Sequence, residues 1–127
     1  MEKLAGVHPV LLERVGLILE VMARLGFPMM VTDGVRTPEE QQALYARGRT
    51  TRGPKVTNAD GVQIRSPHQP QADGFGHAVD CAFVVRGKPS WDEAHPWRLY
   101  GEVARALGLL WGGDWRGLHD RPHVELE

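Results

Sequence analysis

The sequence predicts an α+β fold, with one small domain built from a short antiparallel sheet, flanking helices and one long loop. Three observations predict it. The chain of 127 residues has the length of one domain, which would span residues 1–127. Its 15 glycines and 9 prolines are too many for a helix bundle and fit short elements joined by loops. Helical and strand-like patterns follow one another along the chain without an internal repeat.

The first predicted elements are a helix, a strand and a turn. Apolar residues recur at helical spacing over residues 9–25, and Gly26 with Pro28 ends that helix. Residues 29–32 predict a short buried strand, which leads into a turn at residues 33–34.

A second helix and a long loop are predicted to follow. Thr37 and Glu40 form a capping box with proline at the first helical position, which predicts a helix over about 38–46. Residues 48–75 carry glycine, proline and polar residues without periodicity. A loop that long in a small domain is either disordered or functional, and its position beside the strongest motif favours a function.

The C-terminal half is predicted to supply one helix and most of the sheet. Ser90 and Glu93 form a second candidate capping box ahead of a helix over residues 96–107, which Gly108 ends. Strands are predicted at residues 78–85, 109–111 and 123–126, and a Gly-rich turn at residues 112–113 follows the second of them.

Composition argues against several classes of protein. Fifteen basic and 16 acidic residues leave a formal charge of -1, which argues against a nucleic-acid binder. A single cysteine, Cys81, excludes an internal disulfide framework and a Cys-rich zinc module. No apolar run reaches the ~18 residues that span a bilayer, so we expect no membrane insertion. The first residues show no signal peptide, so synthesis in the cytoplasm is expected.

Asp80 interrupts an otherwise apolar predicted strand. Residues 78, 80, 82 and 84 would share one face, and both faces of this strand are apolar. A desolvated, unpaired carboxylate costs many kcal/mol, so Asp80 must be paired, protonated or bound to a cation. An internal ion pair or a turn-capping role is the alternative explanation.

A second unusual segment is Asp120-Arg121-Pro122-His123. Pro122 fixes its own backbone and favours an extended Arg121, so His123 begins the last strand rigidly and Asp120 stays nearby. A carboxylate three residues before a ligand histidine can reach a metal-bound water without binding the metal. Metal-assisted hydrolysis needs one residue to hold the metal and another to take the proton of the bound water. The alternative is that these four residues are an ordinary start of a strand.

The third ligand of such a site is open at this point. Catalytic zinc sites use three protein ligands and keep one position for water, and Asp80 and His123 supply two. His68 lies in the long loop and could fold over the site, whereas His77 would lie on the strand face opposite Asp80. His95 and His119 are expected at a helix start and in a turn.

Six segments together resemble the M15 zinc peptidases, the D-alanyl-D-alanine carboxypeptidase and dipeptidase family, and especially its phage-type L-alanyl-D-glutamate peptidase branch. The segments occur in family order over nearly the whole chain and comprise residues 31–41, 44–50, 55–59, 76–80, 111–115 and 120–123. The resemblance implies the M15, hedgehog-like zinc peptidase fold.

The resemblance also implies a Zn²⁺ site and a general base. In the family, zinc is held by the histidine and the aspartate of a Ser-x-His-x-x-Gly-x-Ala-x-Asp motif and by the histidine of an acid-x-x-His motif. Asp80, His123 and the base Asp120 match directly. Ser66-Pro67-His68 reproduces Ser-x-His, but five extra residues then precede Gly76.

These extra residues leave three interpretations for the third ligand. In the first, His68 binds zinc and residues 69–74 bulge outward, which we expect because loop insertions cost little and imidazole suits zinc. In the second, Asp73 substitutes as an oxygen ligand. In the third, His77 binds, or the site is degenerate.

Five further residues have an expected place in the site or in the core. Arg36 matches the family arginine that orients substrate and stabilises developing negative charge. Asp114 could hold the other ring nitrogen of a ligand imidazole, and Trp111 with Trp115 could form a cleft wall. Cys81 is expected in the core.

The implied function is a zinc-dependent peptidoglycan peptidase, an L-alanyl-D-glutamate endopeptidase that resembles phage endolysins and acts on stem peptides. The alternatives are a D-Ala-D-Ala carboxypeptidase of the same family and an inactive cell-wall-binding module. The protein is expected to be a monomer that reaches the wall after release from the cytoplasm, without a nucleic-acid partner.

Overall fold

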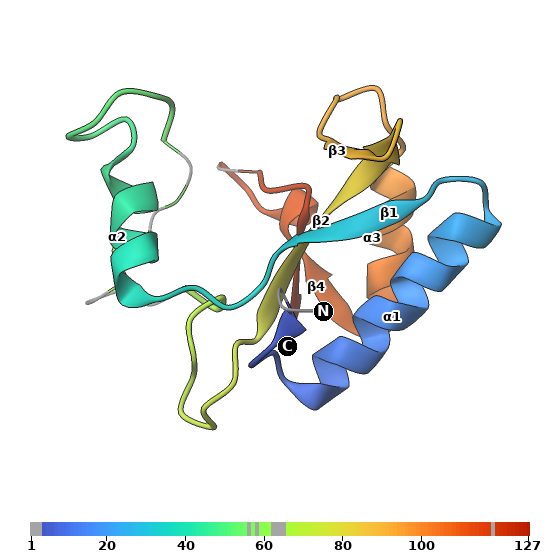
Figure 1. The fold of residues 1–127 in the computed structure, drawn as a ribbon, viewed down its shortest axis with the longest axis horizontal. Helices are drawn as coiled ribbons and strands as arrows, with labels where there is room; N and C mark the ends of the chain where they lie inside the picture. Colours follow the sequence, from blue (N-terminus) through green and yellow to red (C-terminus); the bar gives the residue numbers. More distant parts are fainter. Residues whose placement is uncertain (1–3, 56, 58, 62–65, 118) are drawn as a thin grey trace.

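The computed structural model describes residues 4–55, 57, 59–61, 66–117 and 119–127. Parts of the predicted 48–75 loop and of the family-like segment 55–59 lie outside these residues. Figure 1 shows the chain, whose helices and strands are α1 (Pro9–Arg24), β1 (Met29–Asp33), α2 (Pro38–Ala46), β2 (Ala78–Val85), β3 (Lys88–Ser90), α3 (Trp97–Ala106), β4 (Leu109–Trp111), the 3-10 helix η2 (Gly112–Asp114) and β5 (His123–Leu126).

The strands form one antiparallel sheet in the order β1-β2-β5-β4, and β3 pairs with β2 as a short hairpin. β2 is the longest strand and contacts β1, β3 and β5. The small antiparallel sheet with helices beside it confirms the predicted α+β class.

Helices α1 and α3 lie together against one face of the sheet, whereas α2 stands apart from them (Figure 1). Alternate residues of β2, namely Val79, Cys81 and Phe83, point into the apolar core that these helices cover. Cys81 is fully buried there, as predicted. The intervening residue Asp80 therefore faces the opposite side of the sheet.

The start of α2 confirms one capping box, and the start of α3 contradicts the other. The Thr37 hydroxyl accepts a hydrogen bond from the Glu40 amide, and the Glu40 carboxylate accepts one from the Thr37 amide. Helix α3 begins at Trp97 without a side-chain cap, so the predicted capping box at Ser90 and Glu93 is wrong.

The segment before α3 shows why that prediction fails. Ser90 ends strand β3, and its hydroxyl contacts the His95 Nε2 atom at 2.7 Å. The Asp92 carboxylate accepts the Ala94 amide, which makes a turn rather than a first helical turn. Strand β3 itself has three residues and little apolar character, which explains why periodicity does not reveal it.

Among the described residues, no helix has both the length and the apolar character needed to cross a bilayer.

Candidate metal centre

Asp80 and His123 are brought together by the pairing of β2 with β5. The two residues are direct partners in the antiparallel register, so their side chains lie on the same face of the sheet. The Oδ1 atom of Asp80 lies 3.4 Å from the Nδ1 atom of His123. This face is the one that α1 and α3 leave uncovered.

His68 reaches the same point from the loop before β2. The Ser66 hydroxyl accepts the His68 amide, and the His68 carbonyl accepts the Arg36 amide at 2.8 Å. These bonds fix the backbone so that the His68 Nε2 atom lies 3.1 Å from Asp80 Oδ1 and 3.2 Å from His123 Nδ1. The imidazole is buried, with 1% of its surface exposed.

When both rings are neutral, the form in which they could bind a metal ion, the hydrogen bonds on the far side of each ring fix which nitrogen carries the proton. The Nδ1 atom of His68 lies 2.8 Å from the Gly34 carbonyl oxygen, which can only accept, so Nδ1 carries the proton and the Nε2 of a neutral ring is a free acceptor. The Nε2 atom of His123 lies 2.8 Å from the Glu125 carboxylate, which leaves Nδ1 as the acceptor. Two nitrogen lone pairs and a carboxylate oxygen therefore converge on one point.

The spacing of these three atoms suits a zinc ion. In a tetrahedral site with bonds of about 2.0–2.1 Å, neighbouring ligand atoms are about 3.3 Å apart. The observed separations are 3.1, 3.2 and 3.4 Å. Within the described part of the chain, His68, Asp80 and His123 are the only group of three or more such side chains whose ligand atoms could share a metal ion.

Two alternative third ligands lie elsewhere. The Asp73 carboxylate contacts the His77 Nε2 atom at 2.7 Å and accepts the Phe75 amide, so both residues are engaged with one another in the loop. A turn at residues 71–74 carries Asp73 to an exposed position, which confirms the predicted outward bulge for these residues, whereas Gln69 at the start of the predicted stretch is buried. The structure therefore brings His68, and neither Asp73 nor His77, into the cluster.

In the metal-free protein, the charges around the His68, Asp80 and His123 cluster favour protonation of His123. Burial opposes protonation of His123, but its hydrogen bonds to Asp80 and Glu125 outweigh burial and raise its pKa to about 9. Burial likewise opposes ionisation of Asp80, but the His123 and His68 rings, which can donate to its carboxylate when they are protonated in the metal-free protein, hold the pKa of Asp80 well below its usual value.

Asp120 lies at the edge of the cluster rather than within it. One of its carboxylate oxygens is 3.8 Å from His123 Nδ1, and its side chain is about one-third exposed. Its amide donates to the Gly112 carbonyl and its carbonyl accepts the His123 amide, which fixes the segment between them. Burial and the negative charge of Asp80 raise the pKa of Asp120, as a general base requires.

Arg36 supports the cluster from the other side. Its Nη2 atom lies 3.3 Å from Asp80 Oδ2, its Nε atom 2.7 Å from Asp33 and its Nη1 atom 2.8 Å from the Gln41 side-chain oxygen. Gln41 is fully buried and also donates to the Ala59 carbonyl. The predicted site arginine thus contacts the second oxygen of Asp80, and α2 positions it.

Two residues next to His123 carry contacts that sequence reasoning missed. Glu125 holds the Nε2 atom of the His123 ring, and the Trp115 ring lies against that imidazole with centroids 4.7 Å apart. Residues 123 and 125 lie on one face of a strand, so this spacing is the sequence signal that makes Glu125 a candidate partner of His123.

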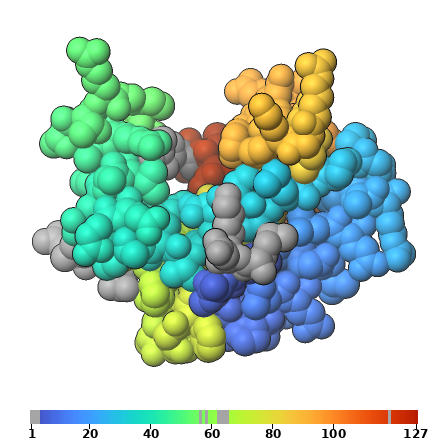
Figure 2. Space-filling model, viewed as in Figure 1, coloured from blue at the N-terminus to red at the C-terminus, as the bar shows by residue number. Residues whose placement is uncertain are grey.

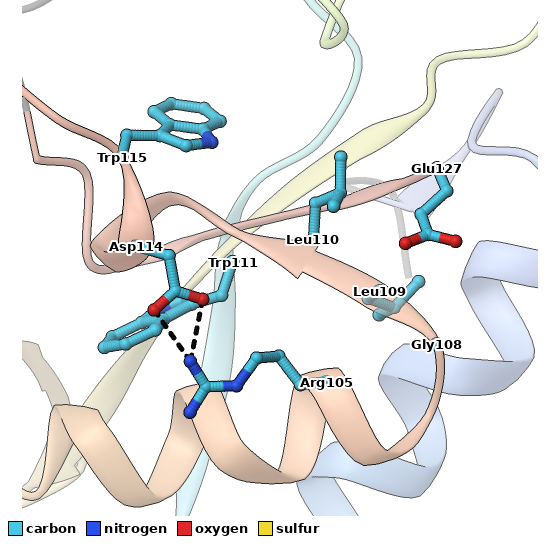
Figure 3. A pocket seen from close by; sticks show the side chains of 8 residues that line it. All are labelled: Arg105, Gly108, Leu109, Leu110, Trp111, Asp114, Trp115 and Glu127. Carbon is cyan, nitrogen blue, oxygen red and sulfur yellow. Dashed lines mark hydrogen bonds and ion pairs between the residues drawn. The ribbon is translucent and has the colours of Figure 1, made fainter.

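The prediction that Asp114 holds a ligand imidazole is wrong. Figure 3 shows the Asp114 carboxylate turned to the guanidinium of Arg105, which it contacts at 2.7 and 2.8 Å. Trp115 points away from this ion pair. Trp111 is buried beside it and donates its indole N–H to the Arg121 carbonyl.

Beside Asp120, the surface is hollowed. Figure 2 shows a depression between the α2 region and the residues around β3, with C-terminal residues at its floor. On the β3 side, Asp120 opens onto a cavity of about 380 Å³, whose lining residues are Trp91, Glu93, Trp97, His119, Asp120, Arg121 and Pro122. His119 therefore lies next to the site, whereas His95 stacks on the Phe83 ring at 4.8 Å.

Sequence comparisons match this chain to named peptidases. A family model described as D-alanyl-D-alanine carboxypeptidase matches residues 60–126. The peptidoglycan L-alanyl-D-glutamate endopeptidase CwlK of Bacillus subtilis is 33% identical over 94% of this chain and 72% of that protein. An L-alanyl-D-glutamate peptidase of a Listeria phage is 25% identical over 80% of this chain and 31% of that protein.

Two solved peptidase structures resemble this chain in fold. The Serratia marcescens L-Ala D-Glu endopeptidase ChiX has a TM-score of 0.67 and 30% identity, covering 99% of this chain and 84% of that chain. The vancomycin resistance D,D-pentapeptidase VanY, solved in complex with Zn(II), shares the fold with a TM-score of 0.65 at 16% identity, over 94% of this chain and 72% of its own. The family-model match over residues 60–126 and the extent of the similarity to CwlK show that this chain belongs to the M15 peptidase family.

Proposed function

We propose that this chain is a zinc-dependent endopeptidase that hydrolyses the L-Ala–D-Glu bond of peptidoglycan stem peptides. The observation that carries the proposal is the convergence of three acceptor atoms, from His68, Asp80 and His123, beside the carboxylate of Asp120. Three ligands leave a position for water, which is the arrangement of catalytic rather than structural zinc sites.

In the proposed mechanism, His68, Asp80 and His123 hold the ion. Zinc bound there supplies a Lewis acid that lowers the pKa of water and polarises a peptide carbonyl. Asp120 accepts a proton from the attacking water while the oxygen of that water bonds to the carbonyl carbon. The carbon–nitrogen bond then breaks, and Asp120 returns the proton to the leaving amine, so that no proton is gained or lost overall.

Arg36 has a positioning and an electrostatic role in this proposal. Its contact with Asp80 Oδ2 leaves Oδ1 directed toward His68 and His123. Its buried positive charge on the α2 side of the cluster also stabilises the negative charge that develops on the carbonyl oxygen.

Relatives favour the endopeptidase reaction over the alternatives. CwlK and ChiX, at 33% and 30% identity, are both named for the L-Ala–D-Glu bond. The D,D-carboxypeptidase reaction is the second candidate, because the matching family model carries that description. The assembled His68, Asp80 and His123 cluster argues against an inactive wall-binding module.

The remaining parts of the proposal concern the whole protein. Residues 1–127 act as one catalytic domain and as a monomer. The protein is made in the cytoplasm and acts on the cell wall after release, as a phage lysin does. Its substrate is the stem peptide, and nucleic acid is not a partner, in keeping with the net charge of -1.

Digestion of intact muropeptides by the zinc-loaded protein tests the function. The expected products, identified by mass spectrometry, carry a new N-terminal D-Glu, and D120N abolishes their formation. Release of free D-Ala without a new N-terminal D-Glu would instead assign the carboxypeptidase reaction. Absence of stoichiometric zinc together with absence of cleavage would assign a binding module.

A further inference from the structure

We propose that the cavity beside Asp120 binds the residue on the amine side of the scissile bond, and that Arg121 recognises the unlinked carboxylate of that residue. This inference rests on the proposed function and names the part of the substrate that the cavity takes. The cavity of about 380 Å³ lies at the lower end of the range for small-ligand sites, which suits a short peptide segment rather than a glycan strand.

Asp120 joins this cavity to the candidate metal centre. Its carboxylate is 3.8 Å from His123 on one side, and the same residue lines the cavity on the other. To return a proton, Asp120 must come within about 2.6–3.2 Å of the leaving nitrogen. The substrate residue that carries this nitrogen therefore has its nitrogen at Asp120, and its remaining atoms extend into the cavity.

The opposite side of the centre is occupied by protein. Arg36 has its guanidinium nitrogens on Asp33, Gln41 and Asp80, and 11% of its side chain is exposed. Because these contacts fill the Arg36 side of the centre, we assign the amine side of the substrate to the cavity beside Asp120.

One cationic side chain among the cavity-lining residues, Arg121, suits a glutamate on the amine side. Glutamate has two carboxyl groups, and a linear peptide continues through only one of them, so the other remains as a carboxylate or an amide. Arg121 is exposed at the cavity and carries the planar donor set that pairs with a carboxylate. Glu93 and Asp120 also line the cavity and disfavour a ligand carboxylate next to either of them, which leaves Arg121 as its partner.

The backbone that carries Arg121 is fixed. The Arg121 carbonyl accepts the Trp111 indole N–H at 2.7 Å, and the next carbonyl, that of Pro122, accepts the Tyr100 hydroxyl at 2.7 Å. A recognition residue on such a support loses little freedom when it pairs with ligand. Trp91, with 53% of its surface exposed, adds an aromatic wall for the aliphatic part of the same residue.

Two matched substrates test the inference. Both are synthetic peptides of the L-Ala–D-Glu series, and they differ only in whether the unlinked carboxyl of the D-Glu is free or a carboxamide. Cleavage is measured as kcat/KM with the zinc-loaded protein. Binding of the two corresponding amine-side products is measured separately by calorimetry, so that the result does not depend on turnover.

The wild-type protein is expected to prefer the free carboxylate by roughly tenfold in both measurements, because a charge-assisted hydrogen bond is lost with the amide. R121Q is expected to bring the ratio near one, and R121K to retain part of it. The control is R98Q, which makes the same change at an exposed arginine outside the cavity lining and keeps the wild-type ratio.

Each outcome decides the inference. Cleavage at L-Ala–D-Glu with equal kcat/KM and equal product binding for the two series would overturn it while leaving the proposed function intact. A wild-type preference for the carboxylate product that is lost in R121Q would support the inference. This holds even if the protein cleaved neither peptide and the proposed function failed. A preference that survives in R121Q would assign the recognition to another residue and overturn the role of Arg121.

Discussion

The Nε2 atom of His123 lies 2.8 Å from the Oε1 atom of Glu125, two residues farther along the same strand. A carboxylate in this position holds the imidazole proton on Nε2 and turns Nδ1 toward His68 and Asp80. The orientation of the candidate ligand therefore depends on a residue that touches no metal position itself.

E125Q is expected to weaken zinc binding by about 10- to 100-fold, the usual cost of losing the carboxylate behind a ligand histidine. The amide removes the charge and can present an N–H to Nε2, which would favour the wrong tautomer. Competition with a chelator measures the affinity. E102Q makes the same change on an exposed position of α3 and is the control. Equal zinc affinity of E125Q and wild type would show that Glu125 does not orient the ring.

Alanine substitutions at the three candidate third ligands separate their roles. H68A is expected to lose stoichiometric zinc, because it removes one of the three converging acceptor atoms. D73A and H77A are expected to retain it, because these side chains pair with one another in the loop. Metal analysis after dialysis against trace zinc gives the comparison. Loss of zinc in D73A or H77A, with retention in H68A, would reverse the assignment.

G112A probes the close approach that positions Asp120. A Cβ atom on Gly112 would clash with the Asp120 carbonyl oxygen and would lie 2.9 Å from the His123 Cβ, so the segment between them must move. A displacement of about 1 Å at a catalytic group can cost about 100-fold, so we expect kcat to fall at least tenfold. The measurement is kcat on a stem-peptide substrate, with circular dichroism to verify folding.

G16A is the matched control for that substitution. Gly16 lies within α1, and a Cβ there meets no atom within 4 Å. Alanine in a helix interior is more stable than glycine by roughly 0.5–1 kcal/mol, so G16A should raise the unfolding free energy and leave kcat unchanged. If G112A matched G16A in activity, the Gly112 contact would have no part in placing Asp120.

Sequence analysis identifies the site residues that are unusual in their local sequence. Asp80 stands out because a carboxylate in an apolar strand needs a partner, and His123 stands out because Pro122 rigidifies its approach. The His68 assignment depends on how five additional residues are accommodated, and only the turn at residues 71–74 shows that they bulge outward.

Contacts between residues with ordinary local sequence are harder to predict. Asp114 and Glu125 are both acidic residues near His123, and the sequence alone does not show which one its ring faces. In the structure, β5 places the Glu125 carboxylate beside the His123 ring, whereas η2 places the Asp114 carboxylate against Arg105 on α3. Similarly, Ser90 and Glu93 have capping-box spacing, but the Asp92 turn prevents the helix from starting there.

The stability of the zinc-free protein is expected to depend on pH through His123. Hydrogen bonds to Asp80 and Glu125 raise its pKa from 6.5 to about 9 in the folded protein, which corresponds to on the order of 3 kcal/mol. Because the folded pKa is the higher one, this stabilisation is fully present below about pH 6.5 and is lost as pH rises toward 9. Above that, the buried Cys81, whose pKa is raised to about 12, would contribute a further loss.

Zinc should act in the opposite direction over the same range, because it binds the deprotonated ring and its binding releases a proton. The gain in Tm on adding zinc to chelator-treated protein is therefore expected to grow between pH 6.5 and 9. Calorimetric scans at matched ionic strength measure both trends, and H123Q should flatten them because it removes the titrating ring. A zinc-induced gain in Tm that stays constant from pH 6.5 to 9 would mean that zinc does not displace a proton from His123.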